Sequence, residues 1–215
     1  MFLLAGQANS FYVRYKLDPQ LELEKAISRM KTVQLYKYTM KSQFVIEDRE
    51  EIISEVTGEK SRENAHIKGE MVNTAIDIYF IGRTVYNYDA AADRWLVIAS
   101  EKDHCEDLLI SELNPLSNFT LDDPGAVYKK AFTKVDGVEC LFVSCFPSGE
   151  NQLLETSWKD IEYHFWIDYK NNTFAKAQLF ANHQKNPSAR LNINLALKNI
   201  NEEFFIEPPD ISIKN

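Results

Sequence analysis

A chain of 215 residues is long enough to bury a sizeable core as one large domain, and its 45% hydrophobic and 26% charged residues are typical of globular proteins. Its formal net charge is −8, from 24 Lys and Arg against 32 Asp and Glu. An acidic chain without a basic cluster is poorly suited to bind nucleic acid, or to adhere to anionic lipid through charge alone. We therefore expect no nucleic-acid partner.

The first predicted element is an amphipathic helix over Pro19–Val33. Asp18 is a good N-cap, and Pro19 suits the first helical position. Apolar residues then recur at a spacing of three or four, at Leu23, Ile27, Met30 and Val33. Because these residues form a single stripe, the helix is expected to pack with one face on a sheet.

From Gln34 the spacing of apolar residues changes to two, which is typical of half-buried strands. The first long strand has its apolar residues at Tyr36, Tyr38, Met40, Phe44 and Ile46. Further strands are predicted over Ile52–Gly58, Ala65–Gly69, Ala75–Ile81, Thr84–Tyr88 and Arg94–Ile98. A second helix is predicted over Glu101–Leu113, because three leucines lie on one side and Pro115 ends it.

The C-terminal half reads as two hairpins and a last strand. The hairpins pair Ala126–Val135 with Val138–Phe146, and Ile161–Tyr169 with Thr173–Asn182. The last strand alternates Leu191, Ile193, Leu195 and Leu197 with polar residues. About ten strands in consecutive hairpins, with two helices, predict a mainly β (α+β) fold. We expect one large curved antiparallel sheet, a half-barrel, with both helices on its concave side. No repeat or linker divides residues 1–215, which are interpreted as a single domain with a lead segment at 1–16.

The sequence contains no recognisable constellation for catalysis, metal binding or cofactor binding. The four histidines, His66, His104, His164 and His183, are scattered over separate elements without the spacing of metal ligands. No glycine-rich phosphate loop or nucleophile elbow is present. The acidic run Glu47–Glu55 lacks the spacing of a calcium loop and is interpreted as a solvated turn. We therefore expect a protein that is not an enzyme and has no metal or cofactor.

Three cysteines are too few for a disulfide framework. Cys140 and Cys145 are five residues apart on one predicted strand, which places them about 17 Å apart on opposite faces. A disulfide needs Cα atoms within about 7 Å, so these two should not bond to each other. Cys105 has acidic neighbours that oppose a thiolate, which disfavours a role as nucleophile.

The alternating apolar rows are the candidate functional feature. Inward positions on a strand usually form ordinary core, and both interpretations stay open from the pattern alone. The functional interpretation is a concave apolar face that two helices only partly cover, which is the usual form of a lipid or small-molecule site. The predicted lining is Tyr36, Tyr38, Met40, Phe44, Ile76, Ile78, Phe80, Leu191, Ile193, Leu195 and Leu197.

The order of elements resembles that of the LolA-like superfamily of bacterial envelope proteins, which includes the LppX and LprG lipoproteins and related lipoproteins of Gram-positive bacteria. The resemblance covers roughly Leu17 to Pro209. It is carried by His66–Met71, Asp77–Tyr88, Arg94-Trp95, Phe165–Asp168 and Phe205–Pro209. It implies a half-barrel with helices at its open side that holds an acyl chain. The implied function is non-enzymatic binding of a lipid or acylated protein, as a carrier or sensor.

The resemblance also implies an extracytoplasmic location in the cell envelope, near a membrane. The segment Met1–Gly6 is apolar but too short for a signal peptide, and no N-terminal lipobox cysteine is present, so the chain departs from the family pattern there. No run of eighteen apolar residues predicts a transmembrane helix. The alternative function is a protein-interaction or regulatory module on the same fold, without a lipid ligand.

Overall fold

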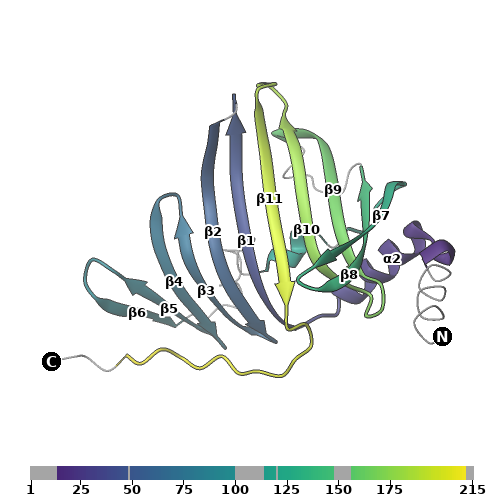
Figure 1. Cartoon of the computed structure of the whole chain (residues 1–215). Helices are drawn as coiled ribbons and strands as arrows, with labels where there is room; N and C mark the ends of the chain where they lie inside the picture. The colour runs from purple at the N-terminus through teal and green to yellow at the C-terminus, as the bar shows by residue number, and fades with distance from the viewer. Residues whose placement is uncertain (1–13, 48, 100–113, 120, 148–155, 212–215) are drawn as a thin grey trace.

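The computed structural model describes residues 14–47, 49–99, 114–119, 121–147 and 156–211, and Figure 1 shows how they are arranged. These residues form one open antiparallel sheet of eleven strands, in the order β6-β5-β4-β3-β2-β1-β11-β10-β9-β8-β7. The predicted fold class is confirmed: the protein is mainly β, with one large antiparallel sheet and few helical residues. The described residues thus form one strand more than the ten or so expected.

The sheet is built from two runs of consecutive hairpins. The first run comprises β1 (Leu35–Ile46), β2 (Arg49–Ser61), β3 (Asn64–Met71), β4 (Thr74–Ile81), β5 (Thr84–Asp89) and β6 (Arg94–Ala99). The second run comprises β7 (Val127–Val135), β8 (Val138–Cys145), β9 (Trp158–Asp168), β10 (Thr173–His183) and β11 (Ala189–Lys198). The two runs join where β1 pairs with β11, near the middle of the sheet, with Tyr38 opposite Leu197 and Met40 opposite Leu195.

Helix α2 (Pro19–Met30) packs on the strands of the second run, β7 to β10. Its start is as predicted, because an Asp18 carboxylate oxygen accepts hydrogen bonds from the amides of Gln20, at 2.9 Å, and Leu21. Its predicted end at Val33 is wrong. The helix stops at Met30, Thr32 lies in the turn that follows, and Val33 lies between that turn and β1. Val33 is nonetheless buried.

Between β6 and β7 the sequence predicts one helix, and the structure describes another, shorter one. The predicted helix Glu101–Leu113 lies outside the described residues. The next described segment starts at Asn114 and contains a short 3-10 helix, η2 (Pro115–Asn118). Its proline occupies the first turn, where a missing amide hydrogen costs nothing.

The acidic run Glu47–Glu55 is not a solvated turn, contrary to the prediction. Strand β2 starts at Arg49, so most of the run is strand, and the turn is confined to its first residues. Ion pairs across the strands accommodate neighbouring charges, with Lys37 2.9 Å from Glu59 and Lys41 3.9 Å from Glu55. Charge on the solvent side of a strand is therefore compatible with a central position in this sheet.

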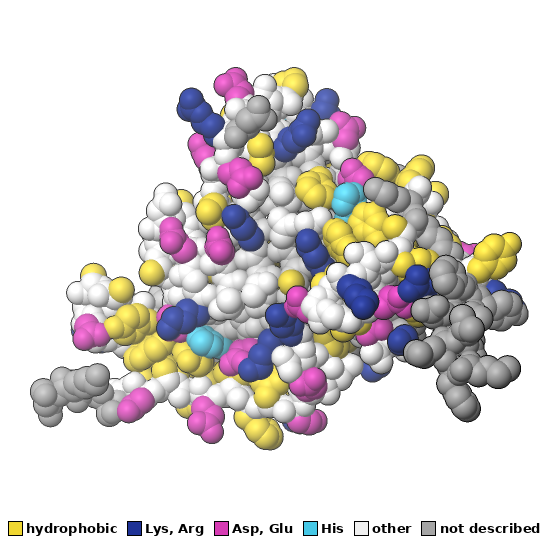
Figure 2. Space-filling view, in the orientation of Figure 1, with side chains coloured by type: hydrophobic (Ala, Val, Ile, Leu, Met, Phe, Trp, Pro, Cys, Tyr) yellow, Lys and Arg dark blue, Asp and Glu magenta, His cyan; other side chains and the backbone are white. Residues whose placement is uncertain are grey.

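The two faces of the sheet differ in character, and we name them by the position of the helix. The inner face is the one on which α2 and η2 pack, and it bears the buried apolar cluster. The outer face, which Figure 2 shows, carries mixed Lys, Arg, Asp and Glu side chains between patches of hydrophobic ones. On this face the Trp95 ring contacts those of Tyr79 and Tyr88, with centroids 5.5 and 5.2 Å away.

Candidate functional site

All eleven residues of the predicted lining lie on the inner face. The register runs in continuous rows across the sheet, for example from Leu197 through Tyr38, Gly58 and Ile67 to Ile78. Nine of the eleven are buried, whereas Phe44 and Ile76 are half-buried against the same cluster. The pattern of period two therefore identified one shared face. Whether these residues contact a ligand stays a prediction.

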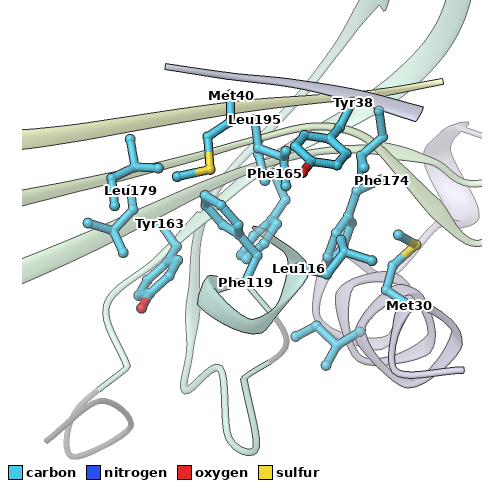
Figure 3. Close-up of a cluster of buried hydrophobic side chains, with 14 of the residues drawn as sticks. Met30, Tyr38, Met40, Leu116, Phe119, Tyr163, Phe165, Phe174, Leu179 and Leu195 are labelled. Carbon is cyan, nitrogen blue, oxygen red and sulfur yellow. The ribbon is translucent and has the colours of Figure 1, made fainter. Parts of the chain in front are cut away.

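Side chains from η2 and α2 fill the central part of the inner face. Figure 3 shows Leu116 and Phe119 directed at the sheet, with Met30 of α2 beside them. The Phe119 ring meets Tyr163 and Phe165 edge-on, with centroids 6.2 and 6.4 Å away. Edge-to-face contacts at this spacing are favourable for aromatic pairs. The middle of the predicted lining is thus packed core in this structure.

An open hollow of about 650 Å³ lies at one end of the inner face. Four elements contribute to it: the last turn of α2, the β7–β8 hairpin, the β9–β10 hairpin and the segment that leaves β11. Its volume is within the range of about 300–1,000 Å³ that is usual for small-molecule sites. Leu197 is the member of the predicted lining that reaches this hollow.

One wall of the hollow is apolar and continuous with the core. This apolar wall consists of Val135, Val138, Phe174, Ala175, Leu197 and Ile200. Phe174 and Leu197 belong to the buried cluster, and Ile200 packs against it. Val138 is 43% exposed, so apolar surface at the hollow is open to solvent. The sequence did not predict this wall, because most of its residues lie at strand ends and hairpin turns, where apolar and polar residues do not alternate.

The rest of the hollow is lined by polar and charged side chains. Lys198 Nζ and Asp136 Oδ2 form an ion pair of 3.0 Å. The Asp168 carboxylate accepts hydrogen bonds from the Lys170 amide, at 3.1 Å, and from the Asn171 side chain, at 2.7 Å. Arg29 also lines the hollow. An apolar wall opposite charged groups suits an amphiphilic ligand better than a purely hydrocarbon one.

A smaller hollow of about 350 Å³ lies on the outer face, over β11, β1, β2 and β3. Thr39, Thr57, Gly58 and Ala196 line it, and their small side chains leave this space between the larger neighbours. The lysines around it have acidic partners: Lys37 pairs with Glu59, and Lys68 lies 2.8 Å from Asp77, which raises the pKa of Lys68. Since its charges are already compensated, this hollow is the weaker candidate for a binding site.

The described histidines lie on three different strands and have structural contacts. His66 is 2.8 Å from Asp77 and stacks on Tyr79 at 3.8 Å. His164 contacts Glu162, and His183 accepts hydrogen bonds from backbone amides after β10. Within residues 14–47, 49–99, 114–119, 121–147 and 156–211, no three His, Cys, Asp or Glu side chains are grouped to hold a metal ion.

Cys140 and Cys145 are both free and buried, which confirms that they do not bond to each other. Burial raises the pKa of Cys140 to about 11 and that of Cys145 to about 12. Both are therefore neutral thiols at physiological pH, and a thiol is a poor nucleophile. Cys105 lies outside the described residues. Among the described helices, none is both long and apolar enough to cross a membrane.

Comparison with known proteins identifies the fold but not a close relative. No family model and no curated protein matches the sequence. Among solved structures, LprF from Mycobacterium bovis is similar with a TM-score of 0.55 at 12% identity, over 88% of this chain and 96% of that chain. A LolA superfamily protein from Nitrosomonas europaea, NE2245, is similar with a TM-score of 0.35 at 10% identity, over 90% and 96% of the two chains. The chain has a LolA-like fold, as the order of its elements predicted.

Proposed function

We propose, from a LolA-like fold with an apolar inner face, that this protein binds the acyl chain of a lipid or of a lipid-modified protein without transforming it. We place it outside the cytoplasm, in the cell envelope, as a carrier or sensor. The observation that carries the proposal is the 650 Å³ hollow, whose apolar wall continues into the buried cluster of the inner face. An acyl chain entering there would meet apolar side chains from the mouth inwards.

The energetics set a minimum for the ligand. Burial of one methylene group contributes about 0.8 kcal/mol. A micromolar dissociation constant corresponds to a binding free energy near −8.2 kcal/mol, so it requires about ten buried methylene groups. The hollow alone is an entrance, and a longer chain would have to displace part of the packing on the inner face. The short helix η2, with Leu116 and Phe119, is the element best placed to yield, since its four residues form little structure of their own.

The described cysteines and histidines support the proposal that the protein does not transform its ligand. The two buried cysteines stay protonated, and the histidines at 66, 164 and 183 lie on separate strands with local partners. Binding by an apolar surface requires no general acid, base or metal. A binding role is therefore sufficient to account for the site.

The test is binding of a fluorescent fatty acyl probe to wild-type protein and to two matched variants. Val138→Asp places a charge on the apolar wall, at a side chain 43% exposed, so the fold should tolerate it. Val97→Asp makes the same change at a side chain 49% exposed on β6, at the far edge of the sheet. We expect Val138→Asp to weaken binding about tenfold or more, because an unpaired charge is costly against a hydrocarbon, and Val97→Asp to leave it unchanged.

Mass spectrometry of organic extracts from the purified protein provides an independent check, with co-purified acyl lipid as the expected finding. Wild-type protein that neither carries lipid nor binds the probe would refute the proposal. Equal loss of binding in both variants would place the probe elsewhere than in the hollow.

A protein-interaction module is the second candidate, and strand β6 favours it. This strand is an edge of the sheet, and its exposed apolar residues are Leu96, Val97 and Ile98. Natural edges are usually protected by charge, which these three residues lack. An extended segment of a partner could add to β6 as a further strand. Loss of a partner with Val97→Asp but not with Val138→Asp would support this alternative.

A further inference from the structure

The hollow at the end of the inner face contains charges of both signs that no described residue pairs. Arg29, Asp168 and Glu202 all line it. No ion pair within 4.0 Å joins any of the three to a described residue, whereas Lys198 and Asp136 in the same lining do pair with each other. Unpaired charges are common on exposed surface. Here, however, a cation and two carboxylates converge on one hollow beside an apolar wall.

The three groups differ in what they still offer a ligand. Arg29 has the planar guanidinium that binds phosphate and carboxylate with two parallel hydrogen bonds. The carboxylate of Glu202 accepts a hydrogen bond from the Asn199 side chain, and that of Asp168 accepts hydrogen bonds from its own turn. Both carboxylates are therefore held in place by neutral donors, and neither forms an ion pair with a described residue. Arg29 also lies in the last turn of α2, where the helix dipole is negative and adds to their attraction for a cation.

We propose, resting on the proposed function, that the ligand is a zwitterionic amphiphile. Its acyl chain lies on the apolar wall, its anionic phosphate binds Arg29, and its ammonium group lies near Asp168 and Glu202. A purely anionic head would satisfy Arg29 but would be repelled by the two carboxylates. A purely cationic head would leave the guanidinium unpaired and repelled. Only a head with both charges complements both sets of groups.

The experiment compares probes that share one dodecyl chain and differ in the head. These are dodecylphosphocholine, dodecyl phosphate, dodecyltrimethylammonium and uncharged monolaurin, each below its micelle concentration, with free phosphocholine as a head without a chain. Isothermal titration calorimetry on the full chain measures the dissociation constants. We expect dodecylphosphocholine to bind about tenfold more tightly than monolaurin, the gain of roughly one charge-assisted contact. Free phosphocholine should not bind measurably.

Two variants and a control assign the contacts. Arg29→Gln should remove the advantage of dodecylphosphocholine over dodecyltrimethylammonium, and Glu202→Gln should reduce its advantage over dodecyl phosphate. Arg190→Gln makes the same charge change as Arg29→Gln at the other end of β11 and should alter neither. Arg29, Glu202 and Arg190 are exposed, so the variants should fold, which circular dichroism verifies.

The outcomes separate this inference from the function on which it rests. If monolaurin binds and every head group binds equally, the zwitterion proposal is wrong while the acyl site stands. If no dodecyl compound binds to wild-type protein, the acyl site itself fails. Tight binding of free phosphocholine would overturn the lipid assignment, because the head would then suffice without the chain.

Discussion

Gly58→Ala should destabilise the protein by forcing the Tyr38 ring from its place in the core. Gly58 lies directly opposite Tyr38 in the β1–β2 register. A Cβ atom on Gly58 would lie 2.2 Å from Tyr38 Cζ and 2.3 Å from the Tyr38 hydroxyl oxygen. Carbon atoms in van der Waals contact are about 3.5–4.0 Å apart, so the overlap is severe. The ring of Tyr38 evidently occupies the space that a side chain at position 58 would need.

The size of the effect depends on whether the Tyr38 ring has room to move. Tyr38 is only 3% exposed, and its ring is tilted against that of Tyr36 with centroids 5.9 Å apart. Overpacking of a core by one methyl group costs about 1–3 kcal/mol. Replacement of a strand glycine by alanine returns about 0.5–1 kcal/mol of backbone entropy. We therefore expect Gly58→Ala to lower the free energy of unfolding by roughly 1–2 kcal/mol.

Urea denaturation of a double-mutant cycle tests this explanation. Tyr38→Leu removes the ring, so Gly58→Ala in that background should cost nothing or be slightly stabilising. Gly82→Ala is the control, because no atom lies within 4 Å of its Cβ position and its positive φ of 59° makes any cost a backbone one. That cost should be the same in the wild-type background and in the Tyr38→Leu background. If Gly58→Ala costs as much without the ring as with it, the steric explanation is wrong.

Three further predictions address the packing of the sheet and its buried groups. Gly69→Ala should be more destabilising than Gly58→Ala in urea, and no side-chain change should rescue it, because its Cβ would lie 2.2 Å from a backbone oxygen of β2. Ser54→Ala should raise the free energy of unfolding by about 1 kcal/mol, since it removes a fully buried hydroxyl that has no hydrogen-bond partner among the described residues. Ser144→Ala, at a buried serine of the outer face, should give no such gain. The raised pKa values of Cys140 and Cys145 predict that alkaline pH destabilises the fold. The contribution of the two thiols to the free energy of unfolding is complete below pH 9, where thiols also stay protonated in the unfolded chain. It is lost as the pH rises through about 11 and about 12. The urea midpoint should therefore fall between about pH 9 and about pH 12. The fall should be smaller with both cysteines replaced by alanine, and an unchanged slope in that variant would contradict the assignment.

Local signals in the sequence were sufficient for most individual elements. Asp18-Pro19 marked the start of α2, because the cap and the proline act within one turn of the chain. The hairpin between Val135 and Val138 was predictable because Asp-Gly favours the positive φ of a tight turn, and Asp136 and Gly137 have φ values of 48° and 85°. Alternation of apolar residues placed Tyr36, Tyr38 and their partners on one face, since side chains of a strand point alternately to its two sides.

Other local predictions failed where a tertiary contact outweighed the pattern. Val33 has the spacing of a helical residue and is buried, yet it lies beyond the helix because the chain has to turn towards β1. Glu50 and Glu51 belong to an acidic run that is typical of a turn, but they lie in β2. Their backbone pairs with β1, and their charged side chains stay exposed there. The sequence pattern therefore predicted correctly that Val33 is buried and that Glu50 and Glu51 are exposed, but it assigned them to the wrong element.

The arrangement of the sheet and the candidate site were decided by tertiary structure alone. The apolar pattern of β1 and β11 shows that each has one buried face, but not that the two strands are neighbours. Backbone hydrogen bonds between strands are the same for every sequence, so the apolar pattern of a strand does not identify which distant strand pairs with it. The hollow also depends on segments that are distant in sequence, because Arg29, the tips of two hairpins and the end of β11 meet around it. The sequence determined which surfaces are apolar, and the packing of distant segments determined where one of them opens to solvent.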